Sequence, residues 1–418
     1  MILKASKKNL IEALDTLSSY NSCPESPGIT RMMFSTAELE ARAYIKKIMC
    51  DTGLVVTEDA IGNIYGTLRG ENPGLAPVWT GSHIDTVRSG GLYDGAVGVV
   101  GGIEACRMIK ESKVKHERDI TVVVFSSEEP TRFGVGCVGS RAMAGHLPLE
   151  TTKNLQDENG ISLYSELERL GYTQLDYNSV LKNPGEVFAS VELHIEQGPH
   201  LEAAACPIGI VEAICAPTYI NVIFEGKQDH AGSTPMNVRR DAMVAAADVI
   251  IKLEDLARSY ADRHTVATVG RLMATPNSSN VIAGRVELFI DIRSINEKSK
   301  NDLTKKICAY IDNVALLRDI KSTCKVLAND RPKASNQNIM AAIQSTCNDM
   351  GIHPLQIVSG AYHDSLFVGE FAPMGMVFIP SHDGISHDPD EFTNPEDIVL
   401  GTEVLANTLV SLANRNEI

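Results

Sequence analysis

The sequence predicts an α/β protein, in which a mainly parallel sheet flanked by helices forms a larger domain and a smaller α+β domain is inserted into it. Apolar runs typical of buried strands alternate with helical runs in the first and last parts of the chain, which is the pattern of a parallel sheet covered by helices. The middle of the chain shows the order β-α-β-β-α-β instead, the ferredoxin-like split motif. A length of 418 residues is enough for two or three domains.

The larger domain is expected at residues 1–211 and 329–418. Its predicted strands and helices alternate along the chain, so the strands should run parallel, with the helices on the faces of the sheet. The predicted strands are 76–86, 119–127, 187–196 and 372–382, and the predicted helices are 95–112 and 394–413.

The smaller domain is expected at residues 212–328, as an inserted lid and dimerisation domain. Its strands alternate apolar and polar residues, the pattern of a sheet with one buried face. The predicted strands are 218–226, 264–274, 284–294 and 322–329, and the predicted helices are 238–260 and 298–317.

Composition and charge exclude several classes of protein. The chain is 44% hydrophobic and 22% charged, as expected for a globular protein, and no apolar run approaches the ~20 residues that a membrane span needs. The formal net charge of −15 argues against a nucleic-acid partner. Nine cysteines without a C-x-x-C pair predict neither a disulfide scaffold nor a structural zinc site. The N-terminus lacks the apolar core of a secretory signal, so we expect a cytoplasmic protein without a membrane partner.

Two adjacent glutamates, Glu128 and Glu129, follow directly after the strongly β-forming run Val122–Ser127. Paired carboxylates repel each other, and burying them is costly unless positive charge lies beside them. Either this pair is exposed to solvent, or another part of the chain supplies the positive charge.

Polar side chains, most of them histidines and carboxylates, lie at or after the ends of the other predicted strands, and one, Asp94, precedes the first predicted helix of the larger domain. They are His83, Asp85, Asp94, His194, Glu196, Gln197, His382 and His387. The carboxyl ends of parallel strands meet at one edge of a sheet, where ligands bind. Imidazole and carboxylate groups gathered at one edge are typical of a divalent-cation site. We therefore expect two cations bridged by Asp94. Glu128 is then the expected general base, and Asp85 is expected to hydrogen-bond the far nitrogen of His83.

Each of these motifs alone has a simpler explanation. His83 and Asp85 could be a solvated strand end, and Glu128 and Glu129 an exposed charge run. His194 could be a satisfied core histidine, and Asp94 could cap a helix. The arrival of the same chemistry at four strand ends favours the metal site over these alternatives.

Seven ordered motifs resemble the two-metal amidohydrolases related to aminoacylases and metallocarboxypeptidases: "GSHIDTV", "YDGAVGV", "EEPTRFG", "GSRAMAG", "ELHIEQGP", "DHAGSTPM" and "SHDPDEF". Within this family, the chain is similar to the branch that cleaves ureido and carbamoyl acids. The resemblance implies a di-metal catalytic domain with Mn²⁺ favoured and Zn²⁺ possible. The metal ligands that it implies are His83, Asp94, Glu129, His194 and His387.

The resemblance also implies roles for other residues. Asp94 bridges the cations, Glu128 is the general base and Asp85 an orienting residue, whereas His382 has no match and is interpreted as a loop histidine. In the inserted domain, the resemblance assigns oxyanion stabilisation to His230. It assigns substrate binding to Gln197, Asn280 and Arg293. Two simpler alternatives stay open: His230 could sit in a turn, and Arg293 could pair with Asp291.

The family implies a homodimer formed through the inserted domain, with open and closed positions and hinges near residues 210 and 328. Exposed edge strands in such a domain make this pairing physically plausible. No nucleic acid or membrane is expected as a partner, and the small partner is a ureido acid.

The motifs point to more than one substrate. "SSEEPTRFG", "LYDG" and "AYHDSLF" resemble ureidoglycolate enzymes, whereas "DHAGSTPMNVRRDA" and "DIRS" resemble the carbamoylase and allantoate branches. Tyr362 and His363 are expected to contact the substrate, although Tyr362 could equally be a packing aromatic.

We expect hydrolysis of the ureido C–N bond of (S)-ureidoglycolate to glyoxylate, ammonia and CO2 by a metal-dependent hydrolase of linear, non-peptide amide or amidine bonds. The alternatives are an N-carbamoyl-L-amino-acid hydrolase or an allantoate amidohydrolase. More remote alternatives are a dipeptidase or aminoacylase and a non-catalytic binding relative.

Overall fold

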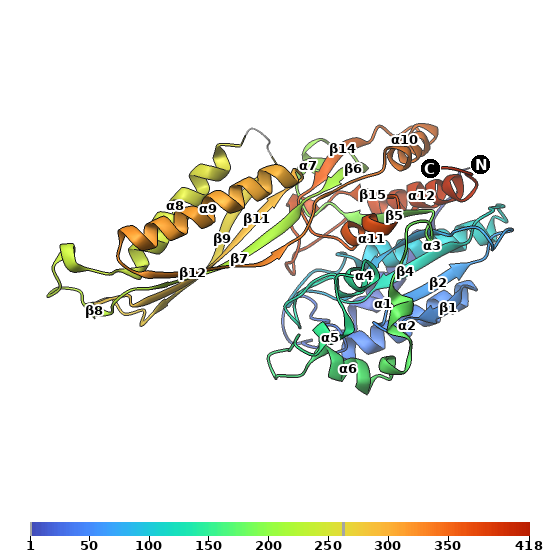
Figure 1. Ribbon diagram of the computed structural model, residues 1–418. Coiled ribbons are helices and arrows are strands. Elements are labelled where there is room, and N and C mark those ends of the chain that lie inside the picture. The colour runs from blue at the N-terminus through green and yellow to red at the C-terminus, as the bar shows by residue number, and fades with distance from the viewer. Residues whose placement is uncertain (1, 261–263) are drawn as a thin grey trace. The chain divides into compact units, whose positions relative to one another are not determined.

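The structure is a computed structural model that describes residues 2–260 and 264–418. The chain divides into two compact units (Figure 1). Unit 1 comprises the chain up to Glu212 together with Ser335–Ile357 and His363–Ile418, and unit 2 comprises Ala213–Ala334 and Val358–Tyr362.

These boundaries differ from the ranges expected from the sequence, which placed 329–334 and 358–362 in the larger domain. Two contacts within unit 2 give the reason. Lys333 and Ala334 pair with Ile214 and Ala213 in a short antiparallel ladder. The backbone N–H of Cys215 donates to the carbonyl oxygen of Ser359. Contacts of this kind depend on the fold and leave no sequence pattern.

A nine-stranded sheet has the order β1-β2-β4-β3-β5-β15-β6-β13, with β14 paired to β6. Its strands belong to unit 1, except that β13 and the last residues of β6 and β14 belong to unit 2. The pairs β4-β3, β3-β5 and β5-β15 are parallel, as predicted for the centre of the sheet. The flanking pairs β1-β2, β2-β4 and β15-β6 are antiparallel, and the sequence did not predict the flanking strands β1, β2 and β6. The strands are β1 (Val55–Glu58), β2 (Ile64–Leu68), β3 (Val78–His83), β4 (Ile120–Phe125), β5 (Ala189–Ile195), β6 (Gly209–Ile214), β13 (Lys333–Ala334), β14 (Leu355–Ser359) and β15 (Met374–Ile379).

Helices cover both faces of this sheet. Alternate residues of β4 enter different cores: Val122 and Val124 pack with α3 and α12, whereas Val123 and Phe125 pack with α4 and α6. Burial on both faces explains why β4 is apolar apart from the buried Thr121. The helices are α1 (Lys7–Ser18), α2 (Thr36–Thr52), α3 (Ala96–Glu111), α4 (Val138–Met143), α5 (Leu149–Thr152), α6 (Leu163–Arg169), α7 (His200–Ala203), α10 (Gln337–Asp349), α11 (Ser365–Phe371) and α12 (Pro395–Ala413), with 3₁₀ turns η1 (Tyr172–Gln174), η2 (Tyr177–Val180) and η4 (His382–Gly384).

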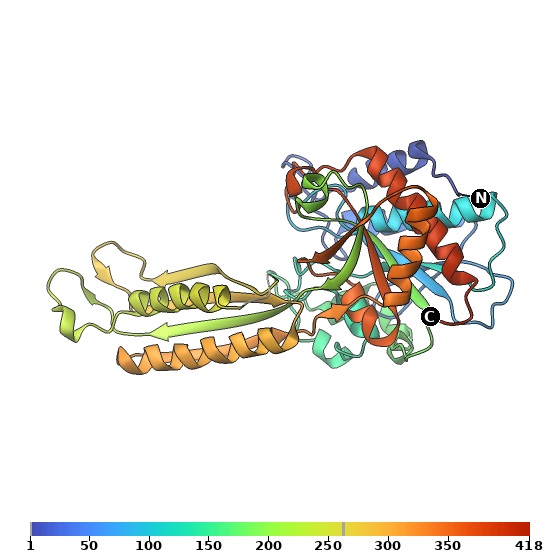
Figure 2. The same cartoon turned by 90° about the horizontal axis from the view of Figure 1, so that it is seen from above.

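Unit 2 is built on a four-stranded antiparallel sheet of order β12-β7-β11-β9. Its chain order is the β-α-β-β-α-β order that the sequence pattern predicted. Helices α8 and α9 lie on one face of this sheet (Figure 2), and their apolar side chains form one core with those of the strands. The elements are β7 (Ala216–Glu225), β8 (Asp229–His230), η3 (Met236–Val238), α8 (Ala242–Arg258), β9 (Val266–Thr275), β10 (Val281–Ile282), β11 (Arg285–Ser294), α9 (Glu297–Leu317) and β12 (Lys321–Asn329).

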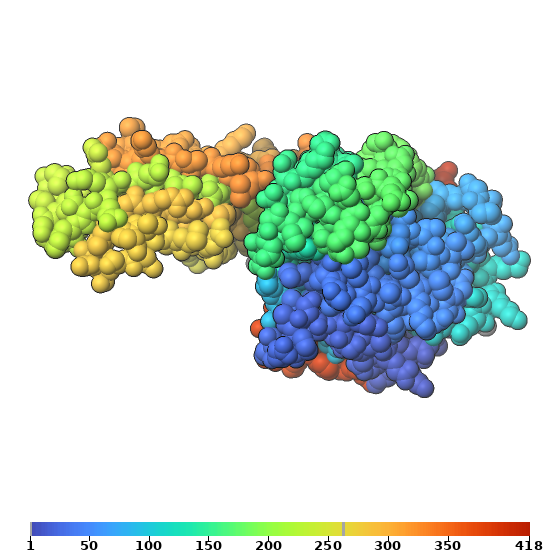
Figure 3. All heavy atoms as spheres, turned by 90° about the horizontal axis from the view of Figure 1, so that it is seen from below, coloured from blue at the N-terminus to red at the C-terminus, as the bar shows by residue number. Residues whose placement is uncertain are grey.

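The edge strands of the unit 2 sheet are much more exposed than its central strands. Along β11 half-buried and buried residues alternate, whereas most residues of β9 and β12 are exposed. The golden-yellow segment around β9 lies open on the surface drawn in Figure 3. Among the residues that the structure describes, no helix is both long enough and apolar enough to cross a bilayer.

Candidate metal centre and active site

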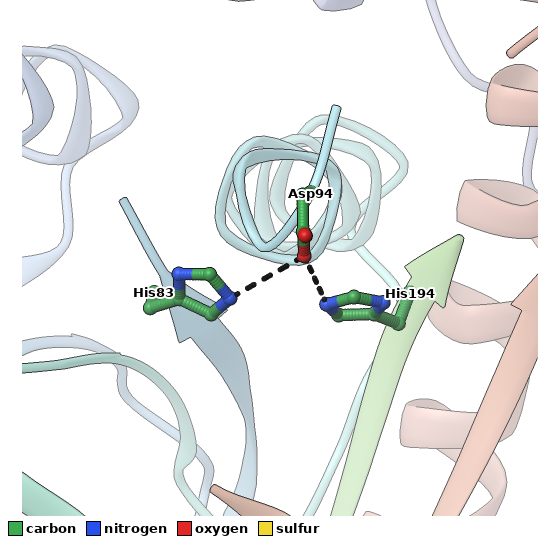
Figure 4. Close-up of side chains that lie close together, drawn as sticks. All are labelled: His83, Asp94 and His194. Atoms are coloured by element: carbon green, nitrogen blue, oxygen red, sulfur yellow. Dashed lines mark ion pairs between the residues drawn. The ribbon is translucent and has the colours of Figure 1, made fainter. Parts of the chain in front are cut away.

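Three buried side chains from different elements of unit 1 meet at the carboxyl end of the parallel strands. His83 is the last residue of β3, His194 is the last residue but one of β5, and Asp94 precedes α3. Asp94 Oδ1 lies 3.6 Å from His83 Nε2 and 3.2 Å from His194 Nε2 (Figure 4). The three ligand atoms are close enough to bind one cation.

The second oxygen of Asp94 belongs to a different group. Asp94 Oδ2 lies 3.0 Å from His387 Nε2, and Glu129 Oε1 lies 3.2 Å from the same nitrogen. Asp94, Glu129 and His387 form a second set with metal-binding spacing. One carboxylate with an oxygen in each of two ligand sets is the arrangement that a bridging ligand between two metal ions requires.

The backbone sets the orientation of two histidines. His83 Nδ1 lies 3.0 Å from the carbonyl oxygen of Asp85, and His194 Nδ1 lies 2.9 Å from that of Ile195. A carbonyl only accepts hydrogen bonds, so in each neutral ring Nδ1 carries the proton and Nε2 keeps the lone pair that a metal ion needs. Both Nε2 atoms point toward Asp94.

Asp85 acts differently from the sequence-based expectation. Strand β3 ends at His83, so the alternation that would align the two side chains does not continue to Asp85. The carbonyl group of Asp85, and not its carboxylate, holds the His83 ring; Asp85 Oδ1 is 3.6 Å from Nδ1. The carboxylate accepts the backbone N–H groups of Glu128 and Glu129 at 3.1 and 3.0 Å. Asp85 therefore fixes the backbone of the paired glutamates.

Glu128 lies beside the first ligand set without belonging to it. Its Oε2 is 3.9 Å from His83 Nε2, and the residue is 7% exposed. Burial raises the pKa of Glu128 well above its ordinary value; the charge of His83 opposes this effect, and the charge of Glu129 adds to it. A carboxyl group with a raised pKa can both accept and return a proton near neutral pH. The thiol of Cys137 donates to Glu128 Oε1 at 3.7 Å, a contact that the sequence did not predict.

The buried carboxylates of the second set are compensated by histidine. Hydrogen bonds to Asp94 and Glu129 raise the pKa of His387 to about 11. Burial opposes ionisation of Asp94, but hydrogen bonds from His194, His387 and His83 hold its pKa well below the ordinary value. The positive charge required by the Glu128–Glu129 pair therefore lies on neighbouring imidazoles, in the place where a cation would supply it.

The residues present suit divalent metals. Imidazole nitrogens and carboxylate oxygens are the mixed donors that bind Mn²⁺ or Zn²⁺. Gln197 Oε1 is buried and has no hydrogen-bond partner among the residues that the structure describes. Its Nε2 donates to Asp94 Oδ2 at 2.9 Å. Gln197, expected at the substrate, thus contacts the Asp94 carboxylate, and its unpartnered oxygen could accept a hydrogen bond from a further ligand.

Other candidate residues of unit 1 have structural partners. His363 is 1% exposed, and its ring packs edge-to-face on His194 at 4.6 Å between centroids. Burial, followed by the charge of His194, holds the pKa of His363 well below its usual range. Glu196 accepts the first backbone N–H groups of α7, and His382 Nδ1 pairs with Glu202 at 2.8 Å.

The candidate residues of unit 2 lie on its strands and turns. His230 Nδ1 accepts the backbone N–H groups of Gly232 and Ser233 at 3.0 and 3.1 Å. The backbone carbonyl oxygen of Asn280 accepts a hydrogen bond from the backbone N–H of Ala231.

Two further candidate residues of unit 2 form hydrogen bonds and ion pairs with other residues of the same unit. Arg293 pairs with Asp291 at 3.0 Å, which is the simpler alternative that the sequence left open, and it also donates to the carbonyl oxygen of Gly360. The hydroxyl of Tyr362 donates to Asp330 Oδ2 at 2.6 Å, so in this structure it holds a segment of unit 2.

The cluster supplies candidate metal-binding groups, and comparison with known proteins specifies the class of the protein. The family model for Peptidase family M20/M25/M40 matches residues 79–411. The chain belongs to this family.

Relatives across nearly the whole chain act on ureido and carbamoyl compounds, to judge from their names. A ureidoglycolate hydrolase from Oryza sativa subsp. japonica is 40% identical over 404 residues, which cover 96% of this chain and 83% of that protein. An N-carbamoyl-L-amino acid amidohydrolase from Geobacillus stearothermophilus is 39% identical over 388 residues, covering 93% of this chain and 94% of that protein. The crystal structure of AtUAH in complex with glyoxylate superposes with a TM-score of 0.89 at 39% identity, covering 98% of each chain. The resemblance seen in the motifs is confirmed.

Proposed function

We propose that this chain hydrolyses the ureido C–N bond of (S)-ureidoglycolate. One water and one substrate would give glyoxylate, CO2 and two ammonia molecules, because the first cleavage leaves a carbamate and a hydroxyglycine that both decompose. Similarity over nearly the full length carries this proposal: the chain is 40% identical to a ureidoglycolate hydrolase over 96% of its residues. The structure matched at a TM-score of 0.89 has glyoxylate bound, and a second has (S)-hydroxyglycine bound.

We propose that two divalent cations, Mn²⁺ in preference to Zn²⁺, bind the two ligand sets. His83, Asp94 and His194 would hold one cation, and Asp94, Glu129 and His387 the other. Such ions supply Lewis-acid polarisation of a carbonyl group and lower the pKa of water.

Glu128 is the proposed general base. It accepts the proton of the attacking water and returns it to the departing nitrogen, which its raised pKa favours. Asp85 holds the backbone of Glu128 and so limits the positions that the Glu128 carboxylate can occupy.

The residues of unit 2 are proposed to bind the rest of the substrate. Because His230 Nδ1 accepts two backbone hydrogen bonds, the neutral ring carries its proton on Nε2, where it can donate to a developing oxyanion. Arg293 is proposed to bind the substrate carboxylate through its guanidinium fork, together with Asn280. Tyr362, His363 and Gln197 stay proposals as substrate contacts.

A second activity, hydrolysis of N-carbamoyl-L-amino acids, has support of similar strength, because the Geobacillus enzyme is 39% identical to the chain. The two activities are separated by measuring kcat/KM of the Mn²⁺-loaded protein on (S)-ureidoglycolate, allantoate and several N-carbamoyl-L-amino acids. The highest value for ureidoglycolate supports the proposal. The highest value for a carbamoyl amino acid overturns it in favour of the alternative.

We further propose that unit 2 is a ferredoxin-like lid through which two chains form a homodimer, with open and closed positions. The exposed edge strand β9 and the neighbouring helix α8 support this, since both carry exposed apolar side chains: Val266, Leu272, Met273, Val244 and Ile251.

Matched variants test this interface. Light scattering at micromolar concentration should report a dimer for the native chain and a monomer for Ile251→Glu. Leu316→Glu, on α9, should stay dimeric. A monomeric native protein would contradict the shared interface.

A cytoplasmic location also stays a proposal. All nine cysteines of the chain are free in the structure, as expected in a reducing compartment.

A further inference from the structure

Two cysteines of unit 2 face each other across two elements. Cys308 lies on α9 and Cys324 on the edge strand β12, and their sulfur atoms are 3.3 Å apart, with the Cys324 thiol donating to Cys308. Both residues are partly exposed, so a small thiol reagent can reach them. The two positions are 16 residues apart in the chain.

The distance of 3.3 Å between the two sulfur atoms is little longer than a disulfide bond. A disulfide has its sulfur atoms about 2.0 Å apart, so closure needs a movement of little more than 1 Å, which side-chain rotation supplies. We propose that Cys308 and Cys324 form a reversible disulfide when the protein meets a disulfide oxidant, for which oxidised glutathione is the probe.

The chemistry proceeds by two thiol–disulfide exchanges. The hydrogen bond from Cys324 lowers the pKa of Cys308, so the Cys308 thiolate attacks one sulfur of oxidised glutathione and releases the first glutathione. Cys324 then loses its proton and attacks the Cys308 sulfur, which releases the second glutathione. Two protein thiols are oxidised and one glutathione disulfide is reduced to two thiols.

The new bond would tie α9 to β12. In the described sheet β12 pairs only with β7, so its outer side has no strand partner. A covalent link to the helix restrains this edge strand, and slower amide exchange in 321–329 is the expected consequence.

Trypsin separates the two cysteines, which makes the test direct. The native full-length chain is incubated with oxidised glutathione, its remaining thiols are alkylated, and the digest is examined by mass spectrometry. A disulfide-linked pair of peptides, 307–318 and 322–325, is expected, and reduction with dithiothreitol should remove it. Amide exchange of 321–329 should slow in the oxidised protein.

One variant and one native cysteine serve as controls. Cys324→Ser should leave a stable glutathione adduct on Cys308 and unchanged exchange in β12. Cys50, which is exposed on α2, should form a mixed disulfide and so report that the oxidant reacted. A glutathione adduct on Cys50 without the linked peptides, or a lasting adduct on Cys308 in the native chain, overturns the proposal.

A second, independent observation concerns Glu391, which lies in the "SHDPDEF" motif and has no role assigned from the sequence. This residue is 5% exposed, and its Oε1 accepts the backbone N–H groups of Tyr93 and Asp94 at 2.8 and 3.1 Å. Its Oε2 accepts the hydroxyl of Ser386 at 2.7 Å. Glu391 thus joins the segment that carries Asp94 to the segment that carries His387.

The loop that carries Gly91 leaves space for the Glu391 carboxylate. A Cβ atom on Gly91 would overlap the Glu391 carboxylate, so only glycine fits at that position. Ser386 Oγ also lies 3.3 Å from Asp94 Oδ2. We infer that Glu391 is a positioning residue that fixes Asp94 relative to His387, an inference that rests on the proposed metal centre.

Glu391→Gln keeps the shape of the side chain but replaces one acceptor oxygen with an N–H donor. Bound Mn²⁺ is measured by elemental analysis and titration, and amide exchange of 92–95 is measured in the metal-free protein. The variant should bind the ion of the set Asp94, Glu129 and His387 10–100-fold more weakly, the loss typical when a residue that supports a metal ligand is replaced. The amides of residues 92–95 should exchange faster.

The matched control is Glu403→Gln. Glu403 is a buried carboxylate of α12 that accepts the N–H of Ala5 and pairs with Lys4, away from the metal ligands. It should leave metal binding and the exchange of 92–95 unchanged. Native ion affinities and native exchange in Glu391→Gln would overturn the inference. A native chain that binds no metal would defeat the proposed function, while the exchange result would still decide the role of Glu391.

Discussion

The candidate residues of unit 1 and unit 2 are held in different ways. Most of those of unit 1 are buried, with His387 as an exposed exception, and they have several partners: Asp94 alone contacts three histidines and the amide of Gln197. Those of unit 2 are more exposed and have local partners, as when His230 bonds to the next turn and Arg293 to Asp291. A preformed buried cluster supplies strong electrostatics, whereas residues on an exposed sheet need a substrate or partner to complete their contacts.

The largest effect is expected from Glu128→Gln in unit 1. Because glutamine cannot take the proton of water, kcat should fall by up to ~10⁴-fold. The residue belongs to neither ligand set, so bound metal should stay at the native amount, as measured by elemental analysis. Glu150→Gln, on the surface, is the control. Native activity in Glu128→Gln would show that Glu128 is not the general base.

His230→Ala in unit 2 should lower kcat by about 10²-fold, the loss typical of one oxyanion donor. Metal content should not change, because the ligands lie in unit 1. His264→Ala, another exposed histidine of unit 2, provides the matched comparison and should keep native rates. Equal rates for both variants would show that His230 has only a structural role in its turn.

Arg293→Lys should raise KM about tenfold or more with a smaller change in kcat, since lysine lacks the planar fork that grips a carboxylate. Arg285, on the same strand, pairs with Glu287 in the same two-residue spacing, so Arg285→Lys is a close control. An identical KM in both variants would show that Arg293 serves only its pair with Asp291.

The last prediction is a dependence of metal binding on pH. His387 has a pKa of about 11 in the metal-free protein and must lose a proton to bind a cation, so affinity should rise up to about tenfold per pH unit below that value. For stability the sign is opposite. The raised pKa stabilises the metal-free fold fully below about pH 6.5, and this stabilisation is lost as the pH rises toward 11.

Both trends can be measured on one sample series. Titration calorimetry in buffers of different ionisation enthalpy should detect proton release on metal binding, and thermal unfolding of the metal-free protein should show the loss of stability. Metal binding without proton release would contradict the assignment of His387.

Sequence periodicity predicted the centre of unit 1 and the element order of unit 2, because these strands and helices are long and strongly patterned. It missed β1 and β14, whose residues are partly exposed and form short runs of four and five residues. The gathering of His83, Asp94, Glu129, His194 and His387 was predictable from the position of most of them at strand ends.

The contacts that orient those side chains were not predictable. The hydrogen bonds of Asp85 depend on the turn after β3, and those of Glu391 on a loop near His387, which itself has a positive φ of 58°. Loop geometry of this kind follows from tertiary packing and has no period in the sequence.

The most direct test of the account is anomalous diffraction from crystals grown with Mn²⁺. Two peaks are predicted in unit 1, one among His83, Asp94 and His194 and one among Asp94, Glu129 and His387, with Asp94 bound to both. The absence of ions from this cluster in metal-supplemented crystals, or ions bound without Asp94, would contradict the account.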